Sequence, residues 1–501
     1  MPQQYLLSID QGTTGTTVSL INTKGQLKLK MNKEFRQIFP KPGWVEHNPA
    51  DIWRSTVSTI RGVLAQAKVS GKQILAIGIT NQRETVMAWD RQTGESVGNA
   101  IVWQCRRTTE FCQTLKKRGI EKRLQKITGL VLDPYFSGTK MHWILNNNPK
   151  AKALARKGQL CFGTVDAFLI WKLTGGESFA TDVSNASRTQ LMDLSTLDYS
   201  DEMMRTFSIK REMLPQIKSS GGHFGSTKKR AGLPAGIPIT GVLGDQQSAL
   251  FGQYCFNSGE AKVTFGTGSF LLMNTKNRKI MSKNGLLTTV GWQLPGQKGV
   301  DYALEGGAFI CGAAVQWLRD NLHLVNKSPD IEKLAKKVED CGGVQFVPSF
   351  AGLGAPFWDP QVRGTMFGLT RGTSNEHLAR ATLEAMALQN VDVVSTMSKD
   401  LGVPLRKVRV DGGASSNNLL MQMQADFLGV EVMRPKVVET TSMGAALMAG
   451  LGAGVWSSLE DLKKMDKIDK SFKGTLRLQQ RNERLKRWHK AIRAMQSYYN
   501  G

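Results

Sequence analysis

Residues 5–15 read YLLSIDQGTTG and combine a short apolar run, an acid and a turn of small residues. The backbone N–H groups and hydroxyls of such a turn, here from Thr13 and Thr14, can approach a polyphosphate closely and donate hydrogen bonds to it. Asp10, just before the turn, is suited to hold Mg²⁺ directly or through water. Neither G-x-x-x-x-G-K-[ST] nor G-x-G-x-x-G occurs in this segment. Taken alone, these residues also fit an ordinary β-turn.

A second segment of the same kind lies half a chain away. Residues 260–270 read EAKVTFGTGSF, so a β-rich run again meets a turn of small residues, which contains Gly266 and Thr267. Two such hairpins indicate an internal duplication of architecture. Facing one another across a cleft, they would hold the phosphate tail of a nucleotide from both sides.

The length of 501 residues exceeds what one hydrophobic core supports and predicts two large domains. We place the first at residues 1–252 and the second at residues 253–501. The sequence has no apolar stretch of membrane-spanning length and no export signal at its N-terminus. The six cysteines form no C-x-x-C pair and the six histidines are scattered, which predicts a cytoplasmic protein with reduced thiols and no zinc site.

The formal net charge is +25, and a basic surface attracts nucleic acid, anionic membranes or anionic small molecules. No recognised nucleic-acid module or aromatic-interleaved basic stripe occurs, so we expect no nucleic-acid partner. Near the C-terminus, apolar residues including Trp488 recur at helical spacing among many Lys and Arg residues. Such a helix could lie on a membrane surface. We favour a closing helix that packs Trp488 onto the domain and leaves its basic face in water.

The pattern of apolar residues predicts an α/β fold built from two similar halves. In the first half we expect strands at 5–9, 17–21, 26–31 and 74–79, with a helix that begins after Asn48. Three strands, a helix and a returning strand form the unit of a ribonuclease H-like fold. In the second half we expect strands at 262–265, 270–274, 286–292, 343–348 and 408–411, with helices at 308–321 and 417–428. A capping box of Thr373 and Glu376 predicts the start of a further long helix.

Residues 240–247 read TGVLGDQQ and contain the best candidate for a catalytic group, Asp245. Phosphoryl transfer to an alcohol needs positioning, charge neutralisation and a base that accepts the hydroxyl proton. A carboxylate at a strand end beside the predicted cleft meets this need. The alternative is that Asp245 caps the helix that follows, but Gln246 adds a polar group that a plain cap does not require.

Arg83 and Glu84 follow a predicted buried strand, where a fork-shaped donor and an acceptor together suit the hydroxyls of a small polyol. A surface ion pair is the alternative. Trp103 and Tyr135 are either core residues or aromatic walls behind the carbon edge of such a substrate. Gly413 lies at a strand-to-helix switch, a favoured nucleotide site in open sheets.

These segments resemble the glycerol kinases of the FGGY sugar-kinase family, which share the actin and hexokinase core. The resemblance extends from Tyr5 to about Asn482. It is most specific in five motifs, at residues 42–47 (PGWVEH), 81–84 (NQRE), 103–108 (WQCRRT), 133–140 (DPYFSGTK) and 185–189 (NASRT). It implies two ribonuclease H-like, actin-like ATPase domains around a catalytic cleft and the transfer of the γ-phosphoryl group of ATP to glycerol, the entry step of glycerol catabolism.

Matching by motif, the resemblance implies a role for individual residues. Glycerol would be bound by Arg83, Glu84, Tyr135, Asp245 and Gln246, with Trp103 and Phe270 as walls. Asp245 would be the base, and Asp10 would hold the water shell of Mg²⁺. The ATP phosphates would be bound by Thr13, Thr14, Gly266 and Thr267, and the adenosine by Gly312, Gln316, Gly413 and Asn417.

This chain departs from the family pattern in three places. Thr17 stands where many relatives have an Arg that reaches the phosphates. Residues 226–233 keep the charge but not the glycines of a loop that binds fructose 1,6-bisphosphate in some bacterial relatives, and residues 476–481 differ from their docking segment for a sugar-transport regulator. We therefore do not carry over the regulation by fructose 1,6-bisphosphate. We expect a homo-oligomer, either a dimer or a tetramer. The alternatives are a related kinase for another small polyol or dihydroxyacetone, and an actin-like or chaperone-like ATPase.

Overall fold

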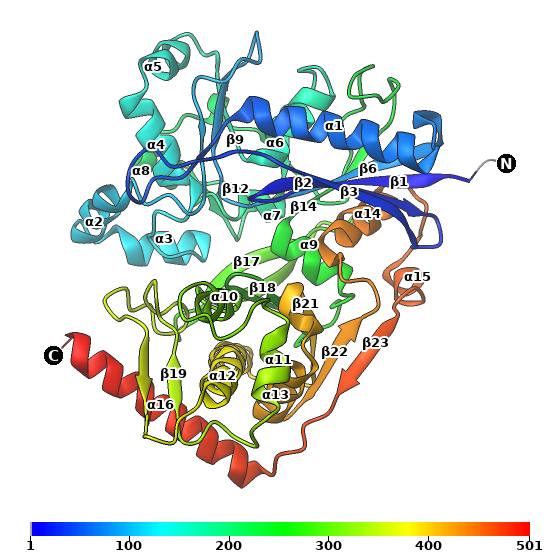
Figure 1. The fold of residues 1–501 in the computed structure, drawn as a ribbon. Helices are drawn as coiled ribbons and strands as arrows, with labels where there is room; N and C mark the ends of the chain where they lie inside the picture. Colours follow the sequence, from blue (N-terminus) through cyan, green and yellow to red (C-terminus); the bar gives the residue numbers. More distant parts are fainter. Residues whose placement is uncertain (1–2, 501) are drawn as a thin grey trace.

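The computed structural model describes residues 3–500. Its first sheet has the strand order β14-β6-β1-β2-β3 (Figure 1). Strands β1 (Tyr5–Gln11), β2 (Gly15–Asn22) and β3 (Leu27–Glu34) are antiparallel, and β6 (Ile74–Asn81) and β14 (Ile239–Gly244) continue the sheet parallel to β1. Helix α1 (Pro49–Ala67) begins after Asn48, whose side chain accepts from the N–H of Ala50, and packs against β2 and β3. The predicted ribonuclease H-like unit is confirmed.

The second sheet repeats this topology around another antiparallel centre, with the order β17-β18-β16-β15-β21-β22-β23. Strands β15 (Ala261–Phe265), β16 (Ser269–Lys276) and β18 (Asp301–Ala308) correspond to the first three strands, and β21 (Lys407–Asp411) and β22 (Glu431–Pro435) run parallel to the centre. Strand β17 (Leu287–Trp292) and strand β23 (Ile468–Phe472) lie at the two edges.

Three details of the predicted second half are wrong. Strand β18 was missed because residues 301–308 read DYALEGGA, and its glycines and acids are weak strand formers; the helix predicted from residue 308 begins only at Gly312. The strand predicted at 343–348 is present as β19 (Gln345–Val347), and it pairs with β20 (Thr365–Phe367) outside the main sheet. The cap of the long helix α12 (Asn375–Leu401) is Ser374 with His377, because the hydroxyl of Thr373 already accepts from the N–H of Thr370.

Two helices cross between the sheets. Helix α9 (Asp245–Gly252) follows β14 of the first sheet and also packs against β15, β16 and β17 of the second. Helix α14 (Thr440–Gly452) follows β22 of the second sheet and packs against β1, β6 and β14 of the first (Figure 1). Glycines permit the close crossing, since a Cβ atom on Gly444 would lie 1.9 Å from the backbone oxygen of Ser248. The division into domains at residues 252 and 253 stays a prediction.

The remaining elements cover the two sheets or extend from them. In the first half they are β4 (Gln37–Ile38), β5 (Glu46–His47), β7 (Met87–Asp90), β8 (Ala100–Ile101), α2 (Thr109–Lys117), α3 (Ile120–Thr128), α4 (Ser137–Asn147), α5 (Pro149–Arg156), β9 (Leu160–Gly163), α6 (Val165–Leu173), β10 (Ala180–Asp182), α7 (Val183–Ala186), β11 (Met192–Asp193), β12 (Asp198–Tyr199), α8 (Asp201–Phe207) and β13 (Gln216–Lys218). In the second half they are α10 (Gly312–Asp320), α11 (Asp330–Ala335), α13 (Asn418–Leu428), α15 (Leu459–Lys463) and α16 (Leu478–Asn500). Short 3₁₀ turns lie at Gly71–Gln73, Arg211–Met213 and Gly413–Ser416.

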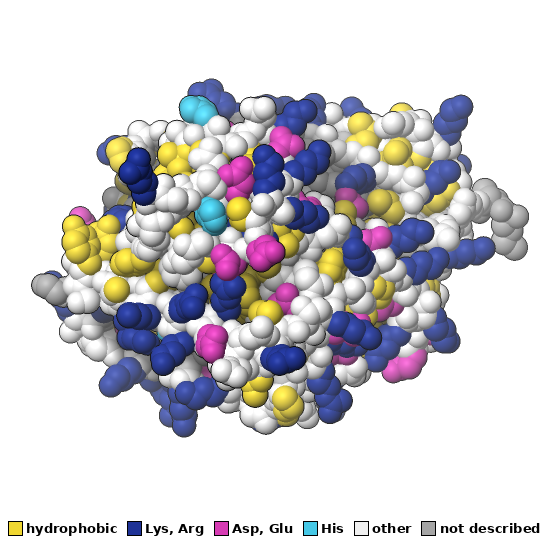
Figure 2. Space-filling view, turned by 60° about the horizontal axis from the view of Figure 1, so that its bottom comes forward, with side chains coloured by type: hydrophobic (Ala, Val, Ile, Leu, Met, Phe, Trp, Pro, Cys, Tyr) yellow, Lys and Arg dark blue, Asp and Glu magenta, His cyan; other side chains and the backbone are white. Residues whose placement is uncertain are grey.

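The C-terminal helix α16 closes the second half, as predicted. The indole of Trp488 is buried and donates to Asp392 of α12 at 2.7 Å, while Lys486, Arg487 and Lys490 are exposed. Figure 2 shows Lys and Arg side chains spread over this side of the molecule among fewer acidic ones, rather than in one continuous stripe. Within residues 3–500, no helix combines the length and apolar character that a membrane crossing requires. All six cysteines are free and buried.

Candidate active site

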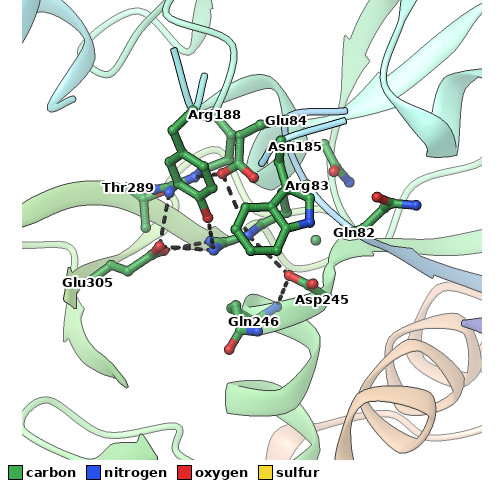
Figure 3. Close-up of polar contacts among 12 residues, drawn as sticks. Gln82, Arg83, Glu84, Asn185, Arg188, Asp245, Gln246, Thr289 and Glu305 are labelled. Atoms are coloured by element: carbon green, nitrogen blue, oxygen red, sulfur yellow. Dashed lines mark hydrogen bonds and ion pairs between the residues drawn. The ribbon is translucent and has the colours of Figure 1, made fainter. Parts of the chain in front are cut away.

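Arg83 and Glu84 lie just beyond β6, at the edge of the first sheet that faces the second. Both are almost fully buried, and Glu84 has a φ of 61°. The guanidinium of Arg83 donates to both carboxylate oxygens of Glu305, at 2.6 and 2.9 Å, and to the amide oxygen of Gln247 at 3.2 Å (Figure 3). The alternative of a surface Arg–Glu pair is therefore wrong.

Two further charged residues complete this cluster, and the sequence reasoning assigned neither of them a role. Arg188, just after α7, donates to Glu84 at 2.6 Å and to Glu305 at 2.9 Å. The four side chains, Arg83, Glu84, Arg188 and Glu305, are each at most 3% exposed. Burial alone would raise the pKa of Glu305, but the guanidinium groups of Arg188 and Arg83 lower it to about 2. Glu305 carried no sequence signal because it lies in the strand that was missed.

Asp245 is the first residue of α9, and its side chain is 29% exposed. One carboxylate oxygen lies 3.1 Å from Nε of Arg83 and also accepts from the N–H of Gln246 at 2.7 Å. The N-cap position belongs to Gly244, so Asp245 is not the capping residue. Burial raises the pKa of Asp245 to about 6, and the charge of Arg83 opposes this rise. A carboxylate with this pKa is a competent proton acceptor near neutral pH.

Three aromatic rings lie together beside these charges. The ring of Trp103 is edge-on to Tyr135 at 5.6 Å and to Phe270 at 6.3 Å between centroids. The indole N–H of Trp103 donates to the hydroxyl of Thr13 at 3.0 Å, which ties the aromatic group to the first hairpin. The hydroxyl of Tyr135 lies 3.5 Å from Arg83. The arrangement offers an apolar wall and hydrogen-bonding groups within one site.

Each of the two hairpins is closed by a backbone hydrogen bond across its turn. The N–H of Gly12 donates to the oxygen of Gly15, and that of Gly266 to the oxygen of Gly268, each at 2.9 Å. Thr14, Gly266 and Thr267 are exposed. The N–H of Gly312, the first residue of α10, donates to the oxygen of Gly266, and a Cβ atom at Gly312 would lie 2.6 Å from that oxygen. Gly312 is therefore needed for this contact between helix and hairpin.

The residues expected around adenosine lie on α10 and at the start of α13. Gln316 is an exposed residue of α10. Gly413 is exposed, with nothing within 4 Å of where a Cβ atom would be. The side chain of Asn417 caps α13 by accepting from the N–H of Leu420 at 2.9 Å, so this residue has a structural role as well.

Asp10 lies near the end of β1, and its carboxylate accepts from the hydroxyl of Ser442 at 3.5 Å. Burial and, to a smaller extent, the nearby charge of Asp245 together raise the pKa of Asp10 to about 7. A buried carboxylate near a second negative charge favours a cation beside it. Mg²⁺ binds through one or two carboxylates together with waters and substrate phosphates, so Asp10 fits it. The described residues hold no cluster of three or more His, Cys, Asp or Glu suited to a metal.

Lys262 of β15 is a third residue to which the sequence assigned no role. It is fully buried, and its ammonium group donates to the amide oxygen of Gln246 and, at 2.7 Å, to the hydroxyl of Thr264. Burial lowers the pKa of Lys262 to about 8, opposed by the charges of Asp411 and Asp245. A lysine within a strand carries no distinctive sequence signal, since such residues normally point to solvent.

The repeated sheets, the crossing helices and the paired hairpins define a two-domain protein with the actin-like ATPase fold. Comparison with known proteins specifies the family. Residues 5–252 match the N-terminal domain, and residues 261–453 the C-terminal domain, of the FGGY family of carbohydrate kinases. The chain belongs to this family.

Individual relatives match over almost the whole chain. It is 56% identical over 488 residues to a glycerol kinase of Bdellovibrio bacteriovorus, covering 97% of this chain and 98% of the relative, and 52% identical over 493 residues to one of Myxococcus xanthus, covering 98% and 99%. A crystal structure of Plasmodium falciparum glycerol kinase with ADP superposes with a TM-score of 0.93 at 37% identity, covering 98% of each chain. A gluconate kinase from Lactobacillus acidophilus shares the fold at 21% identity, with a TM-score of 0.88 over 99% of each chain.

Proposed function

We propose that this protein transfers the γ-phosphoryl group of ATP to a terminal hydroxyl of glycerol and forms sn-glycerol 3-phosphate. The observation that carries the proposal is the grouping of Arg83, Asp245 and the ring of Trp103 directly beside the first hairpin. A small polyol needs polar partners on its hydroxyls and an apolar surface against its carbons. The names of the relatives, matched over nearly the full chain, point to the same substrate.

In this proposal the residues around Asp245 orient the alcohol. Arg83 donates to glycerol hydroxyls and Glu84 accepts from one, while Tyr135 and Gln246 supply further hydrogen bonds. Trp103 and Phe270 cover the carbon edge, since their rings already contact one another. Asp245 accepts the proton of the attacking hydroxyl as the bond to phosphorus forms. A base in its ionised form is required, which a pKa of about 6 provides at neutral pH.

The nucleotide would be bound between the two hairpins. Thr13 and Thr14 on one side and Gly266 and Thr267 on the other donate hydrogen bonds to its phosphates. Gly312, Gln316, Gly413 and Asn417 line the adenosine site. Asp10 would hold Mg²⁺ through water, and the ion, when bound, neutralises charge on the phosphates. We further propose that the enzyme is cytoplasmic and assembles as a homo-oligomer, either a dimer or a tetramer.

Two other functions compete with this one. A related kinase would act on another small polyol or on dihydroxyacetone, and an actin-like or chaperone-like ATPase would not require a polyol. The decisive experiment is a coupled assay of ADP release with a panel of polyols, dihydroxyacetone and no acceptor. We expect the highest kcat/KM with glycerol and little ADP release without an acceptor. Rapid ATP hydrolysis that no polyol stimulates would contradict the proposal.

A further inference from the structure

Glu305 joins the two sheets at the candidate active site. It lies on β18 of the second sheet, whereas Arg83 follows β6 of the first and Arg188 follows α7. One carboxylate thus bridges two guanidinium groups, at 2.6 and 2.9 Å to Arg83 and at 2.9 Å to Arg188. The contact to Arg83 is bidentate, which fixes the plane and the rotation of the guanidinium as well as its distance.

The four charged side chains of the cluster alternate in sign. Glu84 accepts from Arg188 at 2.6 Å and lies 3.8 Å from Nε of Arg83, so each carboxylate contacts both arginines. Two positive and two negative charges balance, as almost complete burial requires. The remaining nitrogen of the guanidinium, Nε, lies 3.1 Å from a carboxylate oxygen of Asp245. Glu305 and Asp245 therefore share one guanidinium, and Glu305 contacts its two terminal nitrogens.

The local backbone is held on both sides of this contact. Strand β17, the neighbour of β18, is attached to the first half of the chain, since the N–H of Thr288 donates to the oxygen of Gly129 and the hydroxyl of Thr289 bonds that of Ser187 at 2.8 Å. Glu305 is therefore presented from a strand pair that is anchored beside Arg188. This anchoring makes the Glu305–Arg83 contact a fixed part of the site.

We propose that Glu305 is a positioning residue of the alcohol site: it fixes the orientation of Arg83 beside the substrate hydroxyls and offsets part of the positive charge that Arg83 presents to Asp245. The inference rests on the proposed function, because it assigns Arg83 to the alcohol and Asp245 to the proton. Glu305 itself does not touch the reacting atoms. It acts through Arg83 in two separable ways, by its reach and by its charge.

Two variants separate these effects. Glu305→Gln removes the charge, and Glu305→Asp keeps the charge but withdraws the carboxylate by one methylene group. Both variants should raise the KM for glycerol about tenfold or more, because each weakens the charge-assisted hydrogen bonds that fix Arg83. Both should leave the KM for ATP close to the wild-type value. The pH profile of kcat/KM falls on its acid side as Asp245 is protonated, and we call this fall the acid limb. In Glu305→Gln the uncompensated charge of Arg83 stabilises ionised Asp245, so the acid limb should move to lower pH. In Glu305→Asp this limb should stay near its wild-type position.

The charges that face Asp245 determine how this limb is interpreted. They are Arg83, Glu84 and Lys262, with Asp10 close by, and none of them is altered in either variant.

The control is a variant that removes a buried carboxylate charge far from the candidate site. Glu384 of α12 is also buried and contacts Arg484 and Arg380 at 3.6 and 3.9 Å. Glu384→Gln should lower the thermal stability without changing the KM for glycerol or the acid limb.

The results distinguish this inference from the proposed function. If the wild-type enzyme prefers another polyol, the proposed substrate is wrong, and the Glu305 variants are compared on that polyol instead. If the wild-type enzyme phosphorylates glycerol but folded Glu305→Gln keeps its KM and its acid limb, Glu305 is not a positioning residue. If Glu305→Gln does not fold, the test rests on Glu305→Asp, which preserves the charge balance of the cluster. An unchanged KM for glycerol in Glu305→Asp would overturn the inference.

Discussion

Nε of Arg83 lies 3.1 Å from a carboxylate oxygen of Asp245, although 162 positions separate the two residues. The register of the first sheet explains this proximity. Strands β6 and β14 are parallel neighbours, and Asn81 pairs with Gly244 at their ends. Arg83 lies two residues after Asn81, and Asp245 lies one residue after Gly244. Both therefore lie at the same edge of the sheet. The proposed ligand of the alcohol and the proposed base are thus electrostatically coupled.

Replacing the proposed base tests the mechanism. Asp245→Asn should lower kcat by about a hundredfold or more, because general-base catalysis contributes about 10²–10⁴. The affinity for nucleotide should change little, which isothermal titration with ADP can measure. Asp359→Asn is a matched control, since Asp359 contacts Gln496 and Asn500 of α16 rather than the candidate site. Near-normal turnover by Asp245→Asn would mean that this carboxylate has only a structural role.

The coupling predicts how Arg83 affects both substrate binding and pH dependence. Arg83→Ala should raise the KM for glycerol by tens-fold, since a charged hydrogen-bond partner contributes about 1.5–3 kcal/mol. The KM for ATP should stay nearly constant. Because Arg83 opposes the rise in the pKa of Asp245 to about 6, its removal should move the acid limb of kcat/KM to higher pH. This shift is opposite to that expected of Glu305→Gln. A rise in the KM for ATP alone would place Arg83 at the nucleotide.

The C-terminal helix provides a pH-dependent contact that is independent of catalysis. His489 lies 2.6 Å from Asp392 of α12, and this hydrogen bond raises the pKa of His489 above its usual value. A group whose pKa is raised on folding stabilises the folded state at pH below 6.5 and loses this contribution as the pH rises through the higher value. The thermal midpoint of the wild-type protein should therefore fall more between pH 6 and 8 than that of His489→Gln. Equal changes in the two proteins would show that the contact contributes nothing measurable.

Local sequence patterns were sufficient for much of the fold. The small-residue turns after β1 and β15, the cap at Asn48 and the buried run of β6 each carry their own signal, and the structure contains all of them. Strand β18 was missed because its identity depends on its neighbours β16 and β17 rather than on its own residues. Glycine and glutamate disfavour strands in isolation, and pairing on both sides overrides that preference.

The same distinction applies to the candidate site. Asp245 and Arg83 were predicted because each follows a recognisable strand end. Glu305, Arg188 and Lys262 received no role because their importance comes from contacts between distant segments, such as the bridge from β18 to the residue after β6. One sequence contains no record of such contacts. The buried charges of this site are therefore visible only when the two halves of the chain are placed together.

Thr17 allows a test of how the phosphates are bound. It lies on β2 directly opposite Asp10, and its hydroxyl accepts from the amide of Asn32 at 2.9 Å. Strand β2 is flanked by β1 and β3, so Thr17 does not lie on an edge strand. The side chains of directly opposed residues in an antiparallel pair lie on the same face. An Arg at position 17 would therefore extend from beside Asp10, the proposed Mg²⁺ residue.

We infer that the protein binds phosphate here without a local arginine and relies on hydroxyls, backbone N–H groups, Mg²⁺ and its net charge of +25. Long-range attraction of this kind is screened by salt over about 10 Å at 0.1 M, whereas a short Arg–phosphate contact is screened much less. The KM for ATP should therefore rise more steeply with ionic strength in the wild-type protein than in Thr17→Arg. The measurement is this KM across a salt series at saturating glycerol, with Thr17→Gln as a control of similar length without charge. Parallel slopes for wild type and Thr17→Arg would show that net charge does not replace the side chain, and an unchanged KM at every salt concentration would show that position 17 does not reach the phosphates.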